Sequence, residues 1–123
     1  MFAIDWRKSI LMQKYKIKMS DYAAEDLENA GDYIQNILLN PTAALNPVRG
    51  IRKAANQLTE FPEAHELDED PLLASLGVRK IYYKEYKLYY VIDEEEHTVT
   101  IVRILHMLVD STRWLYRTFG IIK

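Results

Sequence analysis

The chain has 123 residues, which suits one domain with a single buried core. It has no cysteine and no apolar run near the roughly 20 residues that cross a bilayer, which excludes a disulfide framework, a thiolate metal site and a spanning helix. The net charge is −2, but six of the 18 acidic residues lie within positions 60–70, and without them the chain would carry +4, a modest basic field that leaves nucleic-acid binding open.

The N-terminal stretch interrupts its apolar residues with Asp5, Arg7 and Lys8, so it lacks the continuous apolar core of a signal peptide. We expect a cytoplasmic protein with no membrane contact. Residues 1–12 are either an added arm or a mis-assigned start, and both explanations stay open. The domain proper then spans residues 13–123.

Residues 14–19 alternate strictly, with lysines on one side and Tyr15, Ile17 and Met19 on the other. A period of two predicts a half-buried strand. Its lysines would face solvent and discourage pairing with another sheet edge.

Two helices follow. Ser20 or Asp21 can cap the first helix, and the Asn40-Pro41 pair ends it. The second helix is expected to kink or restart near Asn46-Pro47 and to end at Phe61-Pro62. The apolar stripe of the first is Ala23, Leu27, Ala30, Ile34 and Leu38, and that of the second is Val48, Ile51, Ala55 and Leu58. A tight turn between them predicts an antiparallel helical hairpin.

The rest of the chain reads as an exposed acidic loop through Pro71, three strands and a short helix. The strands are expected at 77–84, 86–93 and 97–106, with a tight turn at Lys84-Glu85, and the helix at 110–119 begins at Asp110 or Ser111. The predicted fold is therefore α+β: an N-terminal strand and an antiparallel helical hairpin packed on a mostly antiparallel four-stranded sheet, with a short C-terminal helix.

Familiar catalytic motifs are missing from the sequence, which has no P-loop, dinucleotide-binding glycine pattern or nucleophile elbow. The three histidines, His65, His97 and His106, lack the spacing of metal ligands. We therefore predict neither a metal nor a cofactor.

The three C-terminal strands do carry cations and tyrosines. Arginines and lysines can bind phosphate oxygens, tyrosines can stack on bases, and an imidazole can transfer a proton. The candidates are Arg79, Lys80, Lys84, Lys87, Arg103, His106, Tyr82, Tyr83, Tyr89 and Tyr90. A structural explanation stands beside the functional one, in which the tyrosines pack the sheet and the arginines pair with acids such as Glu85 or Asp110.

Strict alternation would divide these side chains between two faces. Val78, Lys80, Tyr82 and Lys84 would share one face of their strand, with Arg79, Ile81 and Tyr83 opposite. In the last strand, Val102, Ile104 and His106 would share a face, with Ile101, Arg103 and Leu105 opposite.

Residues 13–117 resemble the RelE/ParE toxin superfamily. The C-terminal half carries the family's ordered pattern of Gly77, Arg79, Tyr86, Tyr90, Asp93, Arg103, His106 and Asp110. The N-terminal half agrees through Ala24, Leu27, Tyr33-Ile34, Asn40-Pro41, Ala43-Ala44, Leu58 and Phe61-Pro62.

The resemblance implies the toxin of a type II toxin–antitoxin, or plasmid stabilisation, system. Such a toxin arrests growth and is held inactive in a complex with a small antitoxin. RelE-like members cut mRNA in the ribosome, whereas ParE-like members poison DNA gyrase. Whether this chain is an enzyme, a ribosome-dependent mRNA endonuclease, is therefore left open.

For RNA cleavage, the resemblance implies that Arg79 binds the scissile phosphate, that Arg103 or Lys87 assists, and that His106 acts as acid or base. Lys80, Lys84, Lys87 and Tyr90 would contact nucleic acid or another target. The sequence departs from the nuclease pattern after the last strand, where residues 107–109 hold no aromatic side chain. The alternative function is a catalytically inactive module that only binds an antitoxin.

Overall fold

The computed structural model describes the backbone of residues 14–38 and 41–121, and the side chains of residues 14–31 and 48–121. Residues 1–12 and Asn40 therefore lie outside the described part of the chain.

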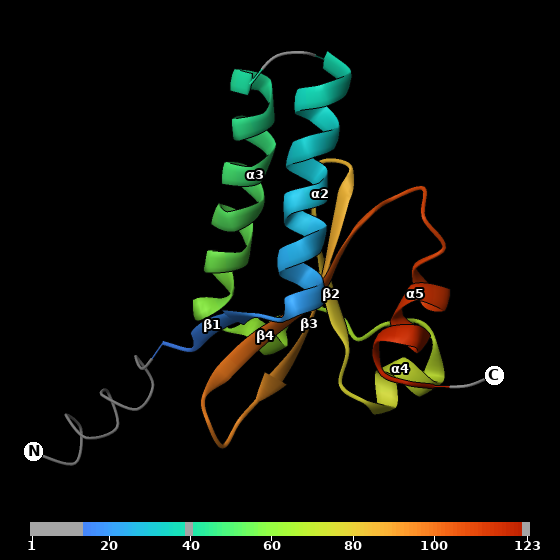
Figure 1. Ribbon diagram of the computed structural model, residues 1–123. Coiled ribbons are helices and arrows are strands. Elements are labelled where there is room, and N and C mark those ends of the chain that lie inside the picture. Colours follow the sequence, from blue (N-terminus) through green and yellow to red (C-terminus); the bar gives the residue numbers. More distant parts are fainter. Residues whose placement is uncertain (1–13, 39–40, 122–123) are drawn as a thin grey trace, which may run out of the picture.

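The centre of the molecule is a four-stranded sheet (Figure 1). Its strands are β1 (Lys16–Met19), β2 (Arg79–Tyr83), β3 (Tyr86–Asp93) and β4 (Thr98–His106). They lie in the order β1-β4-β3-β2, with β1 parallel to β4 and the other two pairings antiparallel. The predicted α+β architecture and mostly antiparallel sheet are confirmed, because period-two patterns of aromatic and β-branched residues specify strands locally.

One face of the sheet is covered by a helical hairpin of α2 (Asp21–Leu38) and α3 (Pro41–Asn56). The predicted stripes supply its core: Ala23, Leu27, Ile51, Ala55 and Leu58 are buried against Leu88, Tyr90, Val99, Ile101 and Ile104 of the sheet. Ile34 and Leu38 lie outside the described side chains. Of the expected kink or restart near Asn46-Pro47, the restart is wrong, because α3 is a single helix through Pro47, and the kink stays a prediction. Packing against the sheet outweighs the one backbone bond that a proline removes.

The opposite face carries shorter elements. They are α4 (Pro71–Ser75) and α5 (Ser111–Thr118). The two short helices η1 (Gln57–Thr59) and η2 (Pro62–Ala64) lead from α3 into the acidic stretch, and Leu58 of η1 is buried in the hairpin-side core. Leu73 of α4 and Leu115 of α5 are fully buried in a second core cluster with Val78, Tyr89, Val102 and Leu105 of the sheet. Asp110 caps α5 through its side chain, as the sequence predicts.

The acidic stretch is more ordered than the expected exposed loop. Leu67 pairs with Arg79 at the edge of β2, and the Asp68 N–H donates to the Val78 carbonyl at 2.8 Å. Asp70 then caps α4, accepting a bond from the Leu73 N–H. Backbone pairing with an edge strand gives this segment a structure that its composition does not indicate.

The expected face assignment of β4 is wrong because the β3–β4 ladder contains a bulge. Tyr89 pairs with Arg103 but Tyr90 pairs with Ile101, so Val102 is an extra residue on β4. Ile101 and Ile104 consequently share the hairpin-side core, whereas Val102 and Leu105 share the other.

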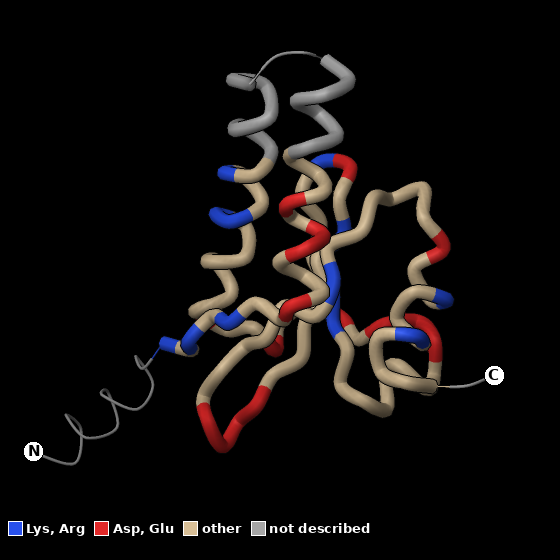
Figure 2. Tube along the Cα trace, viewed as in Figure 1, with Lys and Arg blue, Asp and Glu red and all other residues tan. Residues whose placement is uncertain are grey.

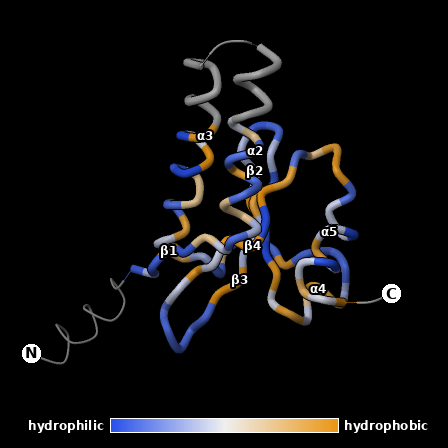
Figure 3. The backbone as a smooth tube through the Cα atoms, viewed as in Figure 1, coloured by the Kyte–Doolittle hydropathy of each residue, from blue (hydrophilic) through white to orange (hydrophobic). Residues whose placement is uncertain are grey.

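Charge and hydropathy are segregated along the chain. Figure 2 shows acidic residues along α2 and in the turn between β3 and β4, and basic residues along the described part of α3. Figure 3 shows hydrophobic residues concentrated in β4 and in the loop that follows it. Among the described residues, no helix combines the length and apolar character needed to cross a membrane.

Candidate functional site

The best candidate surface lies on the sheet face that turns away from the helical hairpin. In the β2–β3 ladder Lys80 pairs with Tyr89, and Tyr82 pairs with Lys87, so these four side chains share one face. Tyr89 is buried beneath α5, whereas Tyr82 is 59% exposed. We call Lys80, Tyr82, Lys87 and Tyr89 the lysine face.

The two lysines of this face influence each other. Burial and then the nearby charge of Lys80 lower the pKa of Lys87 below its ordinary value. Burial also opposes the charge of Lys80, but the hydrogen bond to Glu69 at 3.3 Å and the neighbouring Tyr82 leave its pKa raised. An anion placed between the two ammonium groups would relieve their mutual repulsion.

Tyr89 forms the base of the lysine face. Burial raises the pKa of its phenol, an effect that a hydrogen bond with Ser111 opposes. The ammonium of Lys87 lies 5.9 Å from the centroid of the Tyr89 ring, within the range of a cation–π contact. Strands β2 and β3 thus hold the Lys87 ammonium, the Tyr89 phenol and the exposed Tyr82 side chain on the same face of the sheet.

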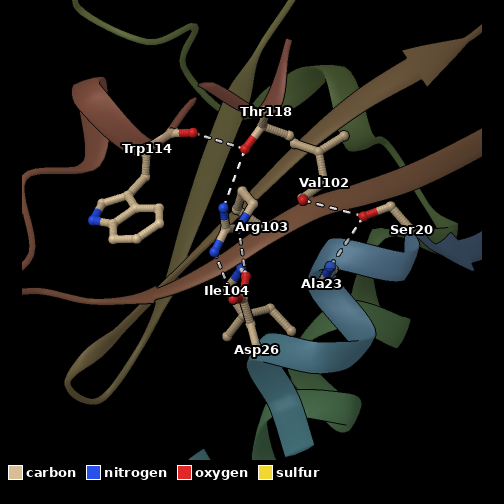
Figure 4. A network of polar contacts seen from close by, with 8 residues as sticks. All are labelled: Ser20, Ala23, Asp26, Val102, Arg103, Ile104, Trp114 and Thr118. Atoms are coloured by element: carbon tan, nitrogen blue, oxygen red, sulfur yellow. Dashed lines mark hydrogen bonds and ion pairs between the residues drawn. The ribbon is translucent and has the colours of Figure 1, made fainter. Parts of the chain in front are cut away.

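Arg103 is not available to a substrate. It is 8% exposed and forms two hydrogen bonds of 2.7 Å with the Asp26 carboxylate, from Nε and from Nη2 (Figure 4). A third bond of 3.2 Å runs from its Nη1 to the Thr118 hydroxyl. The guanidinium also lies 5.4 Å from the Tyr22 ring and 5.3 Å from the Trp114 ring. Arg103 therefore ties α2, β4 and α5 together, which corrects its expected place in an open catalytic site.

Arg79 and Tyr90 are likewise engaged in the fold. Arg79 donates from Nη1 to the backbone carbonyls of Glu63 and His65, and so holds the segment after η2 against β2. Tyr90 is fully buried, and its hydroxyl donates to the Pro62 carbonyl at 2.6 Å. Burial raises the pKa of Tyr90 to about 12. Tyr90 cannot contact a target directly, so the expectation that it does is wrong.

His106 lies on the hairpin side of the sheet, at the end of β4. Its Nδ1 accepts a bond of 3.2 Å from the Leu108 N–H, and its Nε2 lies 3.6 Å from a Glu85 carboxylate oxygen. The imidazole stands edge-on to the Tyr86 ring, with the centroids 5.6 Å apart. It lines a groove of about 380 Å³ together with Asp26 and Asn29 of α2.

The sheet does not gather the predicted catalytic set. Arg79 pairs with Tyr90 and His106 pairs with Tyr86, so the two sit four residue steps apart along β3, about 13 Å. Lys80 and Lys87 are brought together, but on the face opposite to His106. Lys84 occupies the hairpin turn with a φ of 50°, and its ammonium lies 5.6 Å from the Tyr83 ring centroid.

The residue that the sequence reasoning missed is Asp26. Its carboxylate is the partner of Arg103. Its position was a usable signal, because it lies three residues after Ala23 and four before Ala30, on the buried stripe of α2. Within the described ranges, no group of three or more His, Asp or Glu residues is placed to hold a metal ion.

Comparisons with known proteins place this fold. The crystal structure of the toxin–antitoxin complex RelBE2 from Mycobacterium tuberculosis matches with a TM-score of 0.54 and 25% identity, over 77% of this chain and 93% of that one. A chromosomal ParDE toxin–antitoxin structure from P. aeruginosa matches with a TM-score of 0.64 and 21% identity, over 76% of this chain and 97% of that one, and supports the fold alone.

Sequence comparison gives the family. No curated protein matches the chain. The family described as the ParE toxin of the type II toxin–antitoxin system parDE matches residues 17–110, which include the helical hairpin, strands β2 to β4 and all of β1 but its first residue. The chain therefore belongs to the ParE toxin family.

Proposed function

We propose that this chain is the growth-arresting toxin of a type II toxin–antitoxin pair, acting in the cytoplasm on DNA gyrase and neutralised in a complex with its antitoxin. Family membership supports a toxin of this class. The choice of gyrase over mRNA depends on how the structure distributes the residues that RNA cleavage would need.

One observation carries that choice. Cleavage by the RNA 2′-hydroxyl needs a base, an acid and positive charge around one phosphate. Here Arg103 is paired with Asp26, Arg79 is bonded to backbone carbonyls, and His106 lies on the opposite face from Lys80 and Lys87. The residues that RNA cleavage would need are therefore not gathered around one point. Binding to a protein target does not require a base, an acid and a cation to meet at one atom.

A second candidate is cleavage of ribosome-bound mRNA, and the lysine face favours it. Two neighbouring ammonium groups beside an exposed tyrosine ring suit a phosphate and a stacked base. Lys80 and Lys87 would then replace the arginines as the phosphate ligands. Three carboxylates border this face, since Asp68, Glu69 and Asp110 all raise the pKa of Lys87. They would repel a polyanion, so this candidate ranks second.

Expression of the chain alone in a bacterial host tests the proposal. Growth should stop on induction and resume when the small gene beside it is co-expressed. The Asp26→Ala variant, which should be less stable by about 3 kcal/mol, should arrest growth less strongly at equal expression. Normal growth at confirmed expression of folded protein would reject the toxin and leave the alternative, an inactive module that only binds an antitoxin.

A further inference from the structure

Helix α5 carries two exposed arginines and an exposed tryptophan. Arg113 and Arg117 are about one helical turn apart, so their side chains project from the same side of the helix. Trp114 is 39% exposed, and the Arg117 guanidinium carbon lies 5.3 Å from the centroid of its ring. Leu115, by contrast, is fully buried against the sheet. The surface of α5 that is left open is therefore both cationic and aromatic.

This surface continues onto the start of α2. Tyr22 is 54% exposed, and the Arg103 guanidinium lies 5.4 Å from the Tyr22 ring and 5.3 Å from the Trp114 ring (Figure 4). Because Arg103 is itself fixed by bonds to Asp26 and Thr118, both rings are held in place before a partner arrives. We call the following residues the aromatic–arginine face: Tyr22, Arg113, Trp114 and Arg117.

Two cations of this face lack a carboxylate partner in the described part of the chain. Asp110 is engaged as the cap of α5, where it accepts the Arg113 N–H. Asp70 caps α4 and accepts the Tyr116 hydroxyl at 2.9 Å. Among the described residues, no ion pair reaches the guanidinium of Arg113 or Arg117. Both charges are thus available to an acidic group from outside the chain.

The surroundings of the face favour a protein partner over a nucleic acid. Two guanidinium carbons already lie 5.3 Å from the Trp114 ring centroid, which leaves little of that ring free to stack on a base. Asp21 and Glu25 are exposed on α2 beside Tyr22 and would repel a phosphate backbone. Tyr, Trp and Arg side chains contribute most of the binding energy at many protein–protein interfaces.

We propose that the aromatic–arginine face docks on an acidic surface of the toxin's protein target, where Arg113 and Arg117 pair with carboxylates and Trp114 is buried. The inference rests on the proposed function in that it takes DNA gyrase as the target. A guanidinium binds a carboxylate through two parallel hydrogen bonds, which fixes the orientation of the docked surfaces. The rings are already ordered by Arg103, so their immobilisation on binding costs little.

Charge reversal tests the face without changing the core. Arg117→Glu should weaken binding to purified gyrase about tenfold, because an ion pair is replaced by a repulsion. The matched control is Arg52→Glu, at an exposed arginine of α3, which makes the same change of charge elsewhere and should leave the affinity unchanged. The difference between the two variants should shrink as salt is added. Equal affinities of the two variants would overturn the proposal.

A second pair of variants tests the ring. Trp114→Ala should weaken gyrase binding about tenfold, whereas Trp114→Phe keeps an aromatic ring beside the guanidinium groups and should retain most of the affinity. Thermal unfolding shows whether each variant is folded. If Trp114→Ala fails to fold, the two charge reversals decide, and a folded Trp114→Ala that binds as tightly as the wild type would overturn the proposal.

Titrations of Arg117→Glu with two other partners separate the possible occupants of the face. One titration uses linear duplex DNA, and the other uses the antitoxin encoded by the neighbouring gene. Weaker binding to either of them, with the affinity for gyrase unchanged, would overturn the proposal and assign the face to that partner. A loss of affinity confined to gyrase would support it.

Growth assays separate this inference from the proposed function. Arg117→Glu should arrest growth less strongly than Arg52→Glu at equal expression. If both variants inhibit gyrase as the wild type does, the face is rejected and the proposed function stands. If the wild type arrests growth without binding gyrase and Arg117→Glu abolishes the arrest, gyrase is rejected as the target while the face is supported as the surface that binds the target.

Discussion

At the residue scale, the guanidinium of Arg103 and the carboxylate of Asp26 form the most consequential ion pair. Their side chains are only 10% and 11% exposed, and the Asp26 carboxylate also accepts the Ile104 N–H at 2.9 Å. Two buried charges compensate each other only while both are present. Removal of one leaves the other desolvated and without its partner.

Asp26→Ala should therefore lower the free energy of unfolding by about 3 kcal/mol. The matched control is Glu60→Ala, which breaks an exposed pair, since the Lys14 and Glu60 side chains are 66% and 61% exposed and 3.7 Å apart. That change should cost at most about 1 kcal/mol. Urea unfolding measures both, and similar losses would show that Arg103 is not held by this pair.

A second prediction at this scale concerns alkaline pH and Tyr90. Burial raises the pKa of Tyr90 from 10.0 to about 12. Between these two pH values, the folded chain therefore keeps a phenolic proton that the unfolded chain loses. The stabilisation is complete below pH 10 and declines as pH rises toward 12. Tyr90→Phe should lose about 1 kcal/mol at neutral pH, because the Pro62 carbonyl loses its donor.

Between pH 10 and pH 12, the free energy of unfolding of Tyr90→Phe should fall by less than that of the wild type, because the variant has no phenol at position 90 to ionise. Some decline will persist, because a hydrogen bond to Glu94 also raises the pKa of Tyr15 to about 12. Unfolding at a series of pH values provides the comparison, and parallel pH curves for the two chains would contradict the assignment to Tyr90.

At the element scale, the approach of α3 to the β2–β3 hairpin is set by a glycine. A Cβ on Gly50 would lie 2.0 Å from the Tyr83 hydroxyl oxygen. The absence of a side chain at 50 allows the ring to lie across the helix, where it packs against the hairpin-side core. This contact holds β2 beside the helix.

Gly50→Ala should destabilise the chain, because Tyr83 must leave its position. In a Tyr83→Ala background, the same substitution should instead stabilise the chain by up to about 1 kcal/mol, the gain in helix propensity from glycine to alanine. A double-mutant cycle measured by thermal unfolding detects this change of sign. If Gly50→Ala had the same effect on stability in both backgrounds, the contact between position 50 and Tyr83 would not contribute to stability.

The elements also show how much of the fold the sequence predicts. The strands, the helical stripes and the Asp110 cap follow from local periodicity and capping chemistry. The bulge at Val102 does not, because the extra residue is defined by pairing with Tyr89 and Tyr90 far away in the chain. That single shift changed the faces of Ile101 and Val102, whereas Ile104 and His106 keep the shared face that alternation predicts.

At the scale of the whole molecule, two layers divide the predicted site residues. Arg79, Tyr90 and His106 lie on the sheet face that the helical hairpin covers, while Lys80 and Lys87 lie on the opposite face. The sequence pattern identified the cationic strands but not their partners, since Asp26 and the Glu63 and His65 carbonyls come from distant segments. The sequence therefore predicts which strands carry the candidate residues, but it does not predict which side chains and carbonyls those residues contact.

Lys87→Ala tests whether the lysine face takes part in toxicity. If the target binds there, growth arrest should weaken clearly, because the charge at the centre of the face is lost. The matched control is Lys16→Ala on β1, an exposed lysine whose removal should leave toxicity intact. Growth curves at equal expression compare them, and equal toxicity of the two variants would remove the lysine face from the mechanism.

The most direct measurement is a comparison of the purified toxin in two reactions: DNA supercoiling by gyrase, and translation of a defined mRNA. Our proposal predicts that the toxin inhibits supercoiling while the mRNA stays intact, and that the antitoxin reverses the inhibition. Cleavage of the mRNA with supercoiling unaffected would contradict it.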